Sequence, residues 1–482
     1  MADGVILPLA EDFPAPNRAE WLALVEKTLK GGKLEDLVSR TADGLAVKPL
    51  YGPDDAPGAT VRDLRAHDAE RPWDVRMATA HPAPAQANAE VLKDLEGGAA
   101  SVLVKIDPSG HNGVAVGSVE GLGQVLDGVL LDLAPVALDA GYLGPKAADW
   151  LGALAKAAPA APLAFHMDPL SAFAETGESA GPIEAHMVSA ATVGARLAVT
   201  YPKASLMLAT GRTVHEAGGT EAQELGFMAA CAVAYAKVLR RAGVPMEDAF
   251  GRVVLGVCVD GQYFLDIAKV RAARSLWTKI TDACEVSAPA RIEARSSARM
   301  LTTLDPWTNL IRLTSAGFGA AVGGADAIVL GAFTDALGLP TAFARRQARN
   351  TQLILMEEAN LGRVADPAGG AWFLESLSDQ IARAAWTEFQ AIEAAGGVVA
   401  ALGSGVVQAK VAEAREARLA AIAAKEDKVL GVTVFRNGDD AAVAVEKPVA
   451  IPVEAPDPRL PGPDSACEPL APVRFAAAFE EA

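Results

Sequence analysis

Cysteine is scarce in this chain, and basic charge is in the minority. The 482 residues include four cysteines, widely spaced and without a C-x-x-C pair. This favours free thiols in a reducing compartment over a disulfide framework or a zinc site. The 43 basic residues are outnumbered by 60 acidic ones, for a formal net charge of −17. Such a surface repels phosphate backbones and anionic lipid headgroups, so nucleic acid and membrane surfaces are excluded as partners.

Long apolar runs and targeting signals are also missing. No stretch of about 18 apolar residues is free of charges and helix breakers, as a membrane span would require. The N-terminal residues lack a basic region, and Pro8 interrupts their short apolar run, so they do not form a secretory signal. Hydrophobic residues make up 51% and charged residues 21%, enough for a large core. We therefore expect a globular, cytoplasmic protein.

Several motifs of common enzyme classes are absent. The six histidines form no H-x-x-x-H or H-E-x-x-H pair, and the sequence contains no G-x-S-x-G, Walker or strand-linked G-x-G-x-x-G pattern. We therefore expect no metal site. His166 lies at the C-terminal end of a candidate strand, where a rim histidine satisfied by a neighbour is favoured over a catalytic one. Cys258 is flanked by apolar residues, which favours a buried structural thiol over a nucleophile.

Strand-like and helical segments alternate from about residue 70 onward. Alternation of this kind indicates a parallel sheet covered by helices, and eight units is the number that closes a (β/α)8 TIM-type barrel. The clearest helix spans 262–283. An open doubly wound sheet is the second interpretation, although no dinucleotide fingerprint supports it. The eight candidate strands are 101–106, 129–134, 161–166, 205–210, 252–259, 291–296, 326–331 and 363–366.

The N-terminal segment, 1–45, is predicted to be an arm with one amphipathic helix. Asn17 and Glu20 have the spacing of a capping box, and Trp21, Val25 and Leu29 follow at helical intervals. A helix this short cannot fold alone, so it must dock on the body of this chain or on a partner.

The segments after the arm are predicted to be a barrel, a helical linker and a tail. We assign 46–400 to the barrel, in which a long helix covers about 377–395. The linker spans 401–445, with a second helix over about 407–426. The segment 446–482 contains eight prolines, which indicates an irregular tail. Such a tail would lead to a missing domain or wrap around a partner.

Four long strings stand out in the second half of the chain. They are DPWTNLIR at 305–312, ALGLP at 336–340, ARNTQ at 348–352 and GRVADPAGG at 362–370. In this order they closely resemble the coenzyme B12-dependent acyl-CoA mutases, methylmalonyl-CoA mutase above all, over about 10–440. The resemblance implies a barrel whose core is a tunnel for the pantetheine chain of a CoA thioester. It also implies a C-terminal flavodoxin-like domain that brings adenosylcobalamin to the barrel mouth.

Departures from the catalytic pattern of that family are numerous. Ala78 stands where catalytic members carry a tyrosine beside the substrate, and Thr213 stands where they carry a histidine. His215 is two places away from that position, and Arg295 replaces a glutamine that lines the site. The segment around 190–202, which in the family supplies an arginine to the substrate carboxylate, is shortened. The cobalamin signature D-x-H-x-x-G is absent from the sequence.

The chain therefore resembles the non-catalytic small (beta) subunits of heterodimeric methylmalonyl-CoA mutases. The resemblance implies a catalytic large (alpha) subunit as partner, which would carry the adenosylcobalamin, whereas this chain alone would bind none. We expect no catalytic residue here, because Ala78, Thr213 and Arg295 replace the family's. Remnant contacts to an anion or to CoA would come from Arg76, Arg212 and His215. The cobalamin-binding domain is expected to be absent from 446–482.

Two alternatives stay open. The chain could be an independent barrel enzyme for another CoA thioester, with Arg212, Arg295 and His215 forming a new anion site. It could also be the partner subunit of a different B12-dependent acyl-CoA mutase, of the ethylmalonyl or isobutyryl type.

Overall fold

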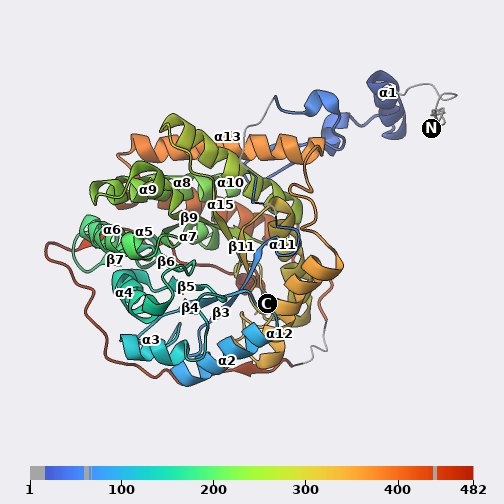
Figure 1. The fold of residues 1–482 in the computed structure, drawn as a ribbon. Coiled ribbons are helices and arrows are strands. Elements are labelled where there is room, and N and C mark those ends of the chain that lie inside the picture. The colour runs from blue at the N-terminus through green and yellow to red at the C-terminus, as the bar shows by residue number, and fades with distance from the viewer. Residues whose placement is uncertain (1–16, 59–63, 67, 438–441, 481–482) are drawn as a thin grey trace, which may run out of the picture.

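The computed structural model describes residues 17–58, 64–66, 68–437 and 442–480 and contains a closed barrel (Figure 1). Eight parallel strands follow one another in the cyclic order β10-β11-β3-β4-β5-β6-β8-β9. The predicted barrel is confirmed, and the open-sheet alternative is wrong. The strands are β3 (Asp74–Thr79), β4 (Ser101–Lys105), β5 (Val136–Asp139), β6 (Ala164–Met167), β8 (Ser205–Thr210), β9 (Val253–Val259), β10 (Ile292–Ser296) and β11 (Ala327–Val329).

Two of the eight predicted strands are wrong, and two real strands, β3 and β5, were missed. The segment 129–134 is a turn in which Leu130 and Leu133 are exposed, and the strand β5 begins only after it. The segment 363–366 is a turn and bend region, with Val364 exposed. The other missed strand, β3, contains Asp74 and Arg76, whose charges hide its apolar pattern. Those charges face the barrel interior, where other charged side chains neutralise them.

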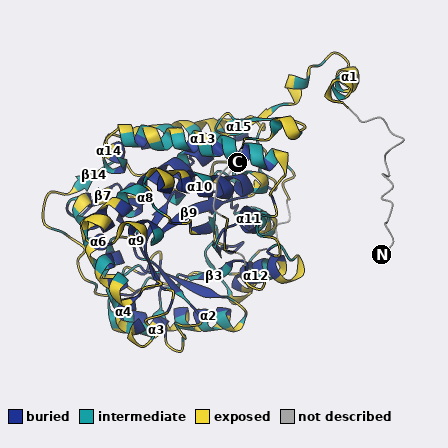
Figure 2. Cartoon of the chain, turned by 45° about the horizontal axis from the view of Figure 1, so that its top comes forward, coloured by how far each residue is buried: buried dark blue, intermediate teal, exposed yellow. Residues whose placement is uncertain are grey.

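Helices cover the outside of the barrel and share one apolar core with it (Figures 1 and 2). The helix predicted at 262–283 is α10, and the predicted 377–395 and 407–426 helices are α13 and α15. The helices of the barrel and linker are α2 (Pro84–Glu96), α3 (Val119–Val125), α4 (Gly144–Leu154), α5 (Pro169–Thr176), α6 (Ile183–Thr200), α7 (Arg212–Glu216), α8 (Glu221–Arg241), α9 (Met246–Gly251), α10 (Tyr263–Ala283), α11 (Asn309–Gly323), α12 (Ala342–Leu353), α13 (Trp372–Ala394), α14 (Val398–Gly403) and α15 (Val406–Ala423).

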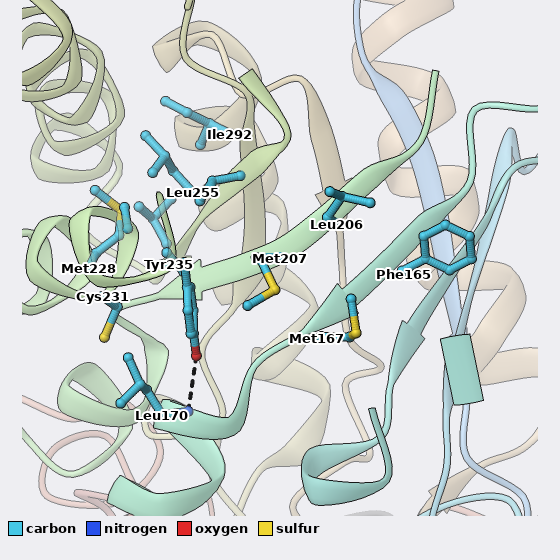
Figure 3. Close-up of a cluster of buried hydrophobic side chains, with 14 of the residues drawn as sticks. Phe165, Met167, Leu170, Leu206, Met207, Met228, Cys231, Tyr235, Leu255 and Ile292 are labelled. Carbon is cyan, nitrogen blue, oxygen red and sulfur yellow. Dashed lines mark hydrogen bonds between the residues drawn. The ribbon is translucent and has the colours of Figure 1, made fainter. Parts of the chain in front are cut away.

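The interface between β6, β8 and α8 shows how this core is built (Figure 3). Phe165 and Met207 are fully buried in it, as is Cys231 of α8. Tyr235 is also buried, and its hydroxyl accepts a hydrogen bond of 3.0 Å from the backbone N–H of Leu170. A buried phenol keeps a polar partner in this way, so the start of α5 is fixed against α8. In the described part of the chain no helix is both long and apolar enough to cross a bilayer.

The helical part of the arm stands apart from the barrel in both views (Figures 1 and 2), whereas the end of the arm contacts the barrel, where the Ala222 N–H donates to Asp43 Oδ2 at 3.2 Å. Its helix α1 (Arg18–Thr28) begins as predicted, because Asn17 Oδ1 accepts a hydrogen bond of 2.8 Å from the Glu20 N–H. No residue of α1 is buried, and an ion pair of 3.6 Å between Arg18 and Asp55 tethers it to the segment before the barrel. The N-terminal residues around Pro8 lie outside the described range. After α1 in the chain, β1 (Ser39–Arg40) and β2 (Ala46–Val47) pair as a small antiparallel hairpin.

The proline-rich tail, 446–480, follows the barrel's own surface instead of leaving it. Its backbone bonds in turn to the loops after β4, β6, β8 and β10, for example through Cys467 N–H to the carbonyl of Gly177 at 2.8 Å. Prolines lack a donor and cannot form a continuous sheet, so the contacts are short and interrupted. The small elements are β7 (Glu178–Ser179) with β14 (Ser465–Ala466), β12 (Leu339–Pro340) with β13 (Val445–Glu446), and α16 (Ala477–Glu480).

Candidate functional site

Ala78 lies inside the barrel on β3. It packs against Leu103, Ala137, Ala164 and Val329, which come from four other strands. Side chains from five strands of a closed barrel can meet only in its interior, so these residues form an apolar layer there. Ala78 also lines a cavity of about 420 Å³ at the barrel mouth, together with His81 and His111. A methyl group at this position supplies no proton donor.

Charged side chains fill the next layer of the interior. Arg76 Nη1 lies 2.5 Å from Glu293 Oε2, and its Nη2 lies 2.8 Å from Asp74 Oδ2. Its Nε donates a hydrogen bond of 2.8 Å to Ser101 Oγ. Each guanidinium nitrogen of Arg76 therefore donates to a group of the chain itself. These bonds use three of its five N–H donors, and the remnant anion contact expected of Arg76 stays a prediction.

Arg295 continues this network across the barrel. Its Nε donates to Glu293 Oε1 at 2.7 Å, and its Nη1 donates to Asp139 Oδ2 at 2.7 Å. In the cyclic strand order β10 and β5 are opposite each other, so the contact with Asp139 crosses the barrel axis. Arg212, at the start of α7, approaches the same Asp139 oxygen at 3.8 Å. The interior at this level contains ion pairs where the family resemblance implied a tunnel.

Burial and pairing together set the charges of this network. Burial alone would raise the pKa of Glu293, but Arg295, His166 and Arg76 hold it well below its usual range. The pKa of Asp139 is likewise held low by Arg295 and Arg212 against its burial. Burial lowers the pKa of His166 to about 4, so its imidazole is neutral at pH 7. At pH 7 the network therefore consists of charged carboxylates paired with charged guanidinium groups, and the neutral imidazole of His166 lies beside it.

His166 occupies a strained position at the end of β6. Its φ of 45° is in the left-handed region, which non-glycine residues rarely adopt. The ring is buried, and Nδ1 lies 3.9 Å from Glu293 Oε2, which is too far for a hydrogen bond, so this nitrogen has no hydrogen-bond partner among the described residues. The role expected for His166, a histidine satisfied by a neighbour, therefore stays a prediction.

Thr213 and His215 lie on α7, directly after β8, and both are buried. His215 Nδ1 is 3.0 Å from Glu224 Oε2, and Lys269 Nζ is 2.9 Å from the same oxygen. Glu224 Oε1 also accepts the backbone N–H of Cys258 at 2.6 Å. His215 is therefore enclosed between α8, α10 and β9, away from the Arg212 and Arg295 guanidinium groups. The structure brings those two arginines together at Asp139 but does not bring His215 to them.

Cys258 is a buried thiol, as predicted, and burial raises its pKa well above the ordinary value. With His215 and Glu224 it forms a group of ligand atoms within 4.8 Å of one another. Lys269 already neutralises the carboxylate of that group, so a metal cation entering it would meet an ammonium ion 2.9 Å from its carboxylate ligand.

Glu293 and Asp139 are the site residues that sequence reasoning missed. The pattern Glu293-Ala294-Arg295 in a strand puts its two charged residues on one face, so this pair could have been found from alternation. Asp139 could not have been found in this way, because the strand that ends at it, β5, was predicted too early in the sequence, at 129–134.

The amino-acid sequence of this chain is similar to known proteins over most of its length. Residues 40–450 match the family model described as methylmalonyl-CoA mutase. The chain belongs to the methylmalonyl-CoA mutase family. It is similar to the methylmalonyl-CoA mutase small subunit of Streptomyces virginiae, with 39% identity over 98% of this chain and 77% of that protein. It is 36% identical to the probable methylmalonyl-CoA mutase small subunit of Mycobacterium bovis, over 86% of this chain and 69% of the relative. The methylmalonyl-CoA mutase small subunit of Propionibacterium freudenreichii subsp. shermanii is 34% identical, over 81% and 64%.

The histidines of the described residues do not fit a cobalamin ligand. The rings of His166 and His215 are enclosed, with side chains 1% and 0% exposed. His186 is buried, and its Nε2 lies 3.0 Å from the Ala180 carbonyl. His81 and His111 reach the mouth cavity, but neither belongs to a D-x-H-x-x-G sequence.

Proposed function

We propose that this chain is the non-catalytic small (beta) subunit of a heterodimeric methylmalonyl-CoA mutase. It would act in the cytoplasm and stabilise a catalytic large (alpha) subunit. The holoenzyme would interconvert (R)-methylmalonyl-CoA and succinyl-CoA with adenosylcobalamin held by the large subunit. The names of the similar small subunits support this proposal.

The observation that carries the proposal is the Arg295–Asp139 contact across the barrel axis. A thioester chain threading the barrel would have to break this pair and the Arg76–Glu293 pair. Separating one buried pair costs about 3–5 kcal/mol, so the interior favours its own ion pairs over a ligand. Loss of a positioned donor at Ala78 or Thr213 would by itself lower a rate by about 10²–10⁴.

The same geometry weighs against an independent enzyme. An anion site built from Arg212, Arg295 and His215 would need all three side chains at one point. Instead, His215 is paired with Glu224 while the two arginines lie beside Asp139.

The test is to purify the chain alone and together with a co-expressed large subunit. We expect the lone chain to show no visible cobalamin absorbance after incubation with adenosylcobalamin, and no mutase turnover. We expect co-purification with the large subunit and activity of the pair. The variant Ala78→Tyr with Thr213→His should leave the lone chain inactive, because the new histidine follows Gly211 at the second position and so does not create the D-x-H-x-x-G cobalamin signature. Stoichiometric cobalamin on the lone chain would overturn the proposal.

A further inference from the structure

A second cavity, of about 460 Å³, lies at the rim of the barrel. Its wall combines segments that are far apart in the sequence: the arm hairpin at Arg40, the loops after β8, β9 and β10, the linker helix α15 and the tail at Phe475. Ala78 and Thr213 are not part of this wall, so the cavity is separate from the positions discussed above.

The wall carries a surplus of positive charge, although the chain as a whole is strongly acidic. Five cations line it against three carboxylates. Arg299 is paired with Asp260, at 3.3 Å, and Arg418 is paired with Asp427, at 3.0 Å. The other three cations of the wall have no carboxylate within ion-pair distance in the described part of the chain: Arg40, Arg312 and Lys428.

Arg312 is the most constrained of these three. It is half-buried on α11, and its nitrogens donate to neutral acceptors only: Thr302 Oγ1, Asn309 Oδ1 and the Leu430 carbonyl, at 2.7 to 3.1 Å. These bonds fix the guanidinium in place, while the carboxylates of Asp305 and Glu480 act on it electrostatically without forming an ion pair. The N-terminus of α11 reaches the wall at Thr308, has no side-chain cap and has no acidic residue in its first turn. Its helix dipole adds positive potential at the wall, next to Asp305, which accepts a hydrogen bond from the Thr308 hydroxyl.

The remaining wall is apolar. Leu265, Ile311 and Ile422 line it, and the Phe475 ring lies 5.3 Å from the Arg299 guanidinium. A purely inorganic ion would leave this surface in contact with water, whereas a ligand with an apolar body would cover it.

We propose that this cavity binds a small organic anion: a carboxylate or phosphate ester with an apolar body. The anionic group lies among Arg312, Arg40 and Lys428, and the apolar body lies against the leucine and isoleucine side chains. Because the arm, linker and tail all contribute to the wall, the bound ligand joins these three segments to the barrel.

Isothermal titration calorimetry of the full chain tests the proposal with three probes: phenyl phosphate, benzoate and inorganic phosphate. The variant R40Q/K428Q removes two exposed charges from the wall and leaves the hydrogen-bonded Arg312 in place. The matched control K93Q/R383Q removes two exposed charges from α2 and α13, outside the cavity, with the same change in net charge.

We expect saturable 1:1 binding of phenyl phosphate or benzoate, weakened about tenfold in R40Q/K428Q, which corresponds to about 1.4 kcal/mol. The control should bind as the unmodified chain does. Equal affinity in all three proteins, or no saturable binding up to about 10 mM, would overturn the site. Inorganic phosphate bound as tightly as phenyl phosphate would overturn the assignment to an organic anion.

Discussion

Arg295 and Asp139 meet across the axis of the barrel, with Nη1 and Oδ2 2.7 Å apart on opposite strands. Their contact, together with Arg76 and Glu293, makes the centre of the barrel a paired polar core. A core of this kind is stable only while every charge keeps its partner, since an unpaired buried charge is far more costly than a missing pair.

Glu293→Gln should destabilise the chain strongly. The substitution leaves Arg76 and Arg295 buried beside each other without the carboxylate that joins them, and we expect a loss of about 3–5 kcal/mol in the free energy of unfolding. Urea denaturation measures it. The control Asp149→Asn breaks a surface pair with Arg196, whose side chains are 37% and 61% exposed, and should cost less than about 1 kcal/mol. Similar losses in the two variants would contradict a paired core.

His166 should make stability depend on pH in the acid range. Its folded-state pKa of about 4 is below the ordinary value of 6.5, so the unfolded chain binds the proton first. The stability that the neutral imidazole contributes is complete above pH 6.5 and is lost as the pH falls toward 4. His166→Asn removes this pH dependence, and asparagine tolerates the left-handed backbone. The difference in the free energy of unfolding between the two proteins should change by about 3 kcal/mol over that window, measured by denaturation at several pH values. If the unfolding free energies of the two proteins followed parallel pH profiles, His166 would not be the group that titrates.

Deleting residues 1–32 should weaken pairing with the large subunit. The helix α1 buries none of its residues on this chain, and a helix of 11 residues is marginal alone, so its apolar side chains need a surface elsewhere. We expect the arm to contribute to an interface above about 2,000 Å² in total. Affinity is measured by calorimetry or surface plasmon resonance. The triple variant of Trp21, Val25 and Leu29 to alanine should weaken pairing likewise; unchanged affinity in both would show that pairing does not use the arm.

Gly117→Ala should displace the tail. A Cβ at Gly117 would overlap the Glu454 carbonyl oxygen, a backbone atom that cannot rotate away as the end of a side chain can. Overpacking of this kind costs about 1–3 kcal/mol, and we expect faster proteolytic cleavage near Glu454. The control Gly251→Ala has nothing within 4 Å of its new Cβ and should cleave like the unmodified chain. Identical cleavage of the two variants would mean that the tail is not held at this loop.

The fold class could be predicted from the sequence because strand–helix alternation is a local pattern. Six of the eight predicted strands overlap real ones, since Val, Leu and Ile at consecutive positions are typical of strands buried on both faces. The strand β3 escaped this reasoning because Asp74 and Arg76 point into an interior that neutralises them. Asp74 and Arg76 pair with each other, but their other partners, Ser101 and Glu293, lie 25 to 217 positions away in the chain, which no local pattern contains.

The sequence by itself determined the barrel and the start of the arm helix, and it predicts that Ala78 and Thr213 replace catalytic residues of the family. The tertiary structure alone decided what fills the interior and where the tail runs. Arg295 meets Asp139 only because closing eight strands brings β10 and β5 face to face. His215 turns from the arginines to Glu224 because α8 and α10 pack over the end of β9. Such contacts come from the closure of the whole barrel, so they cannot be derived from any single segment.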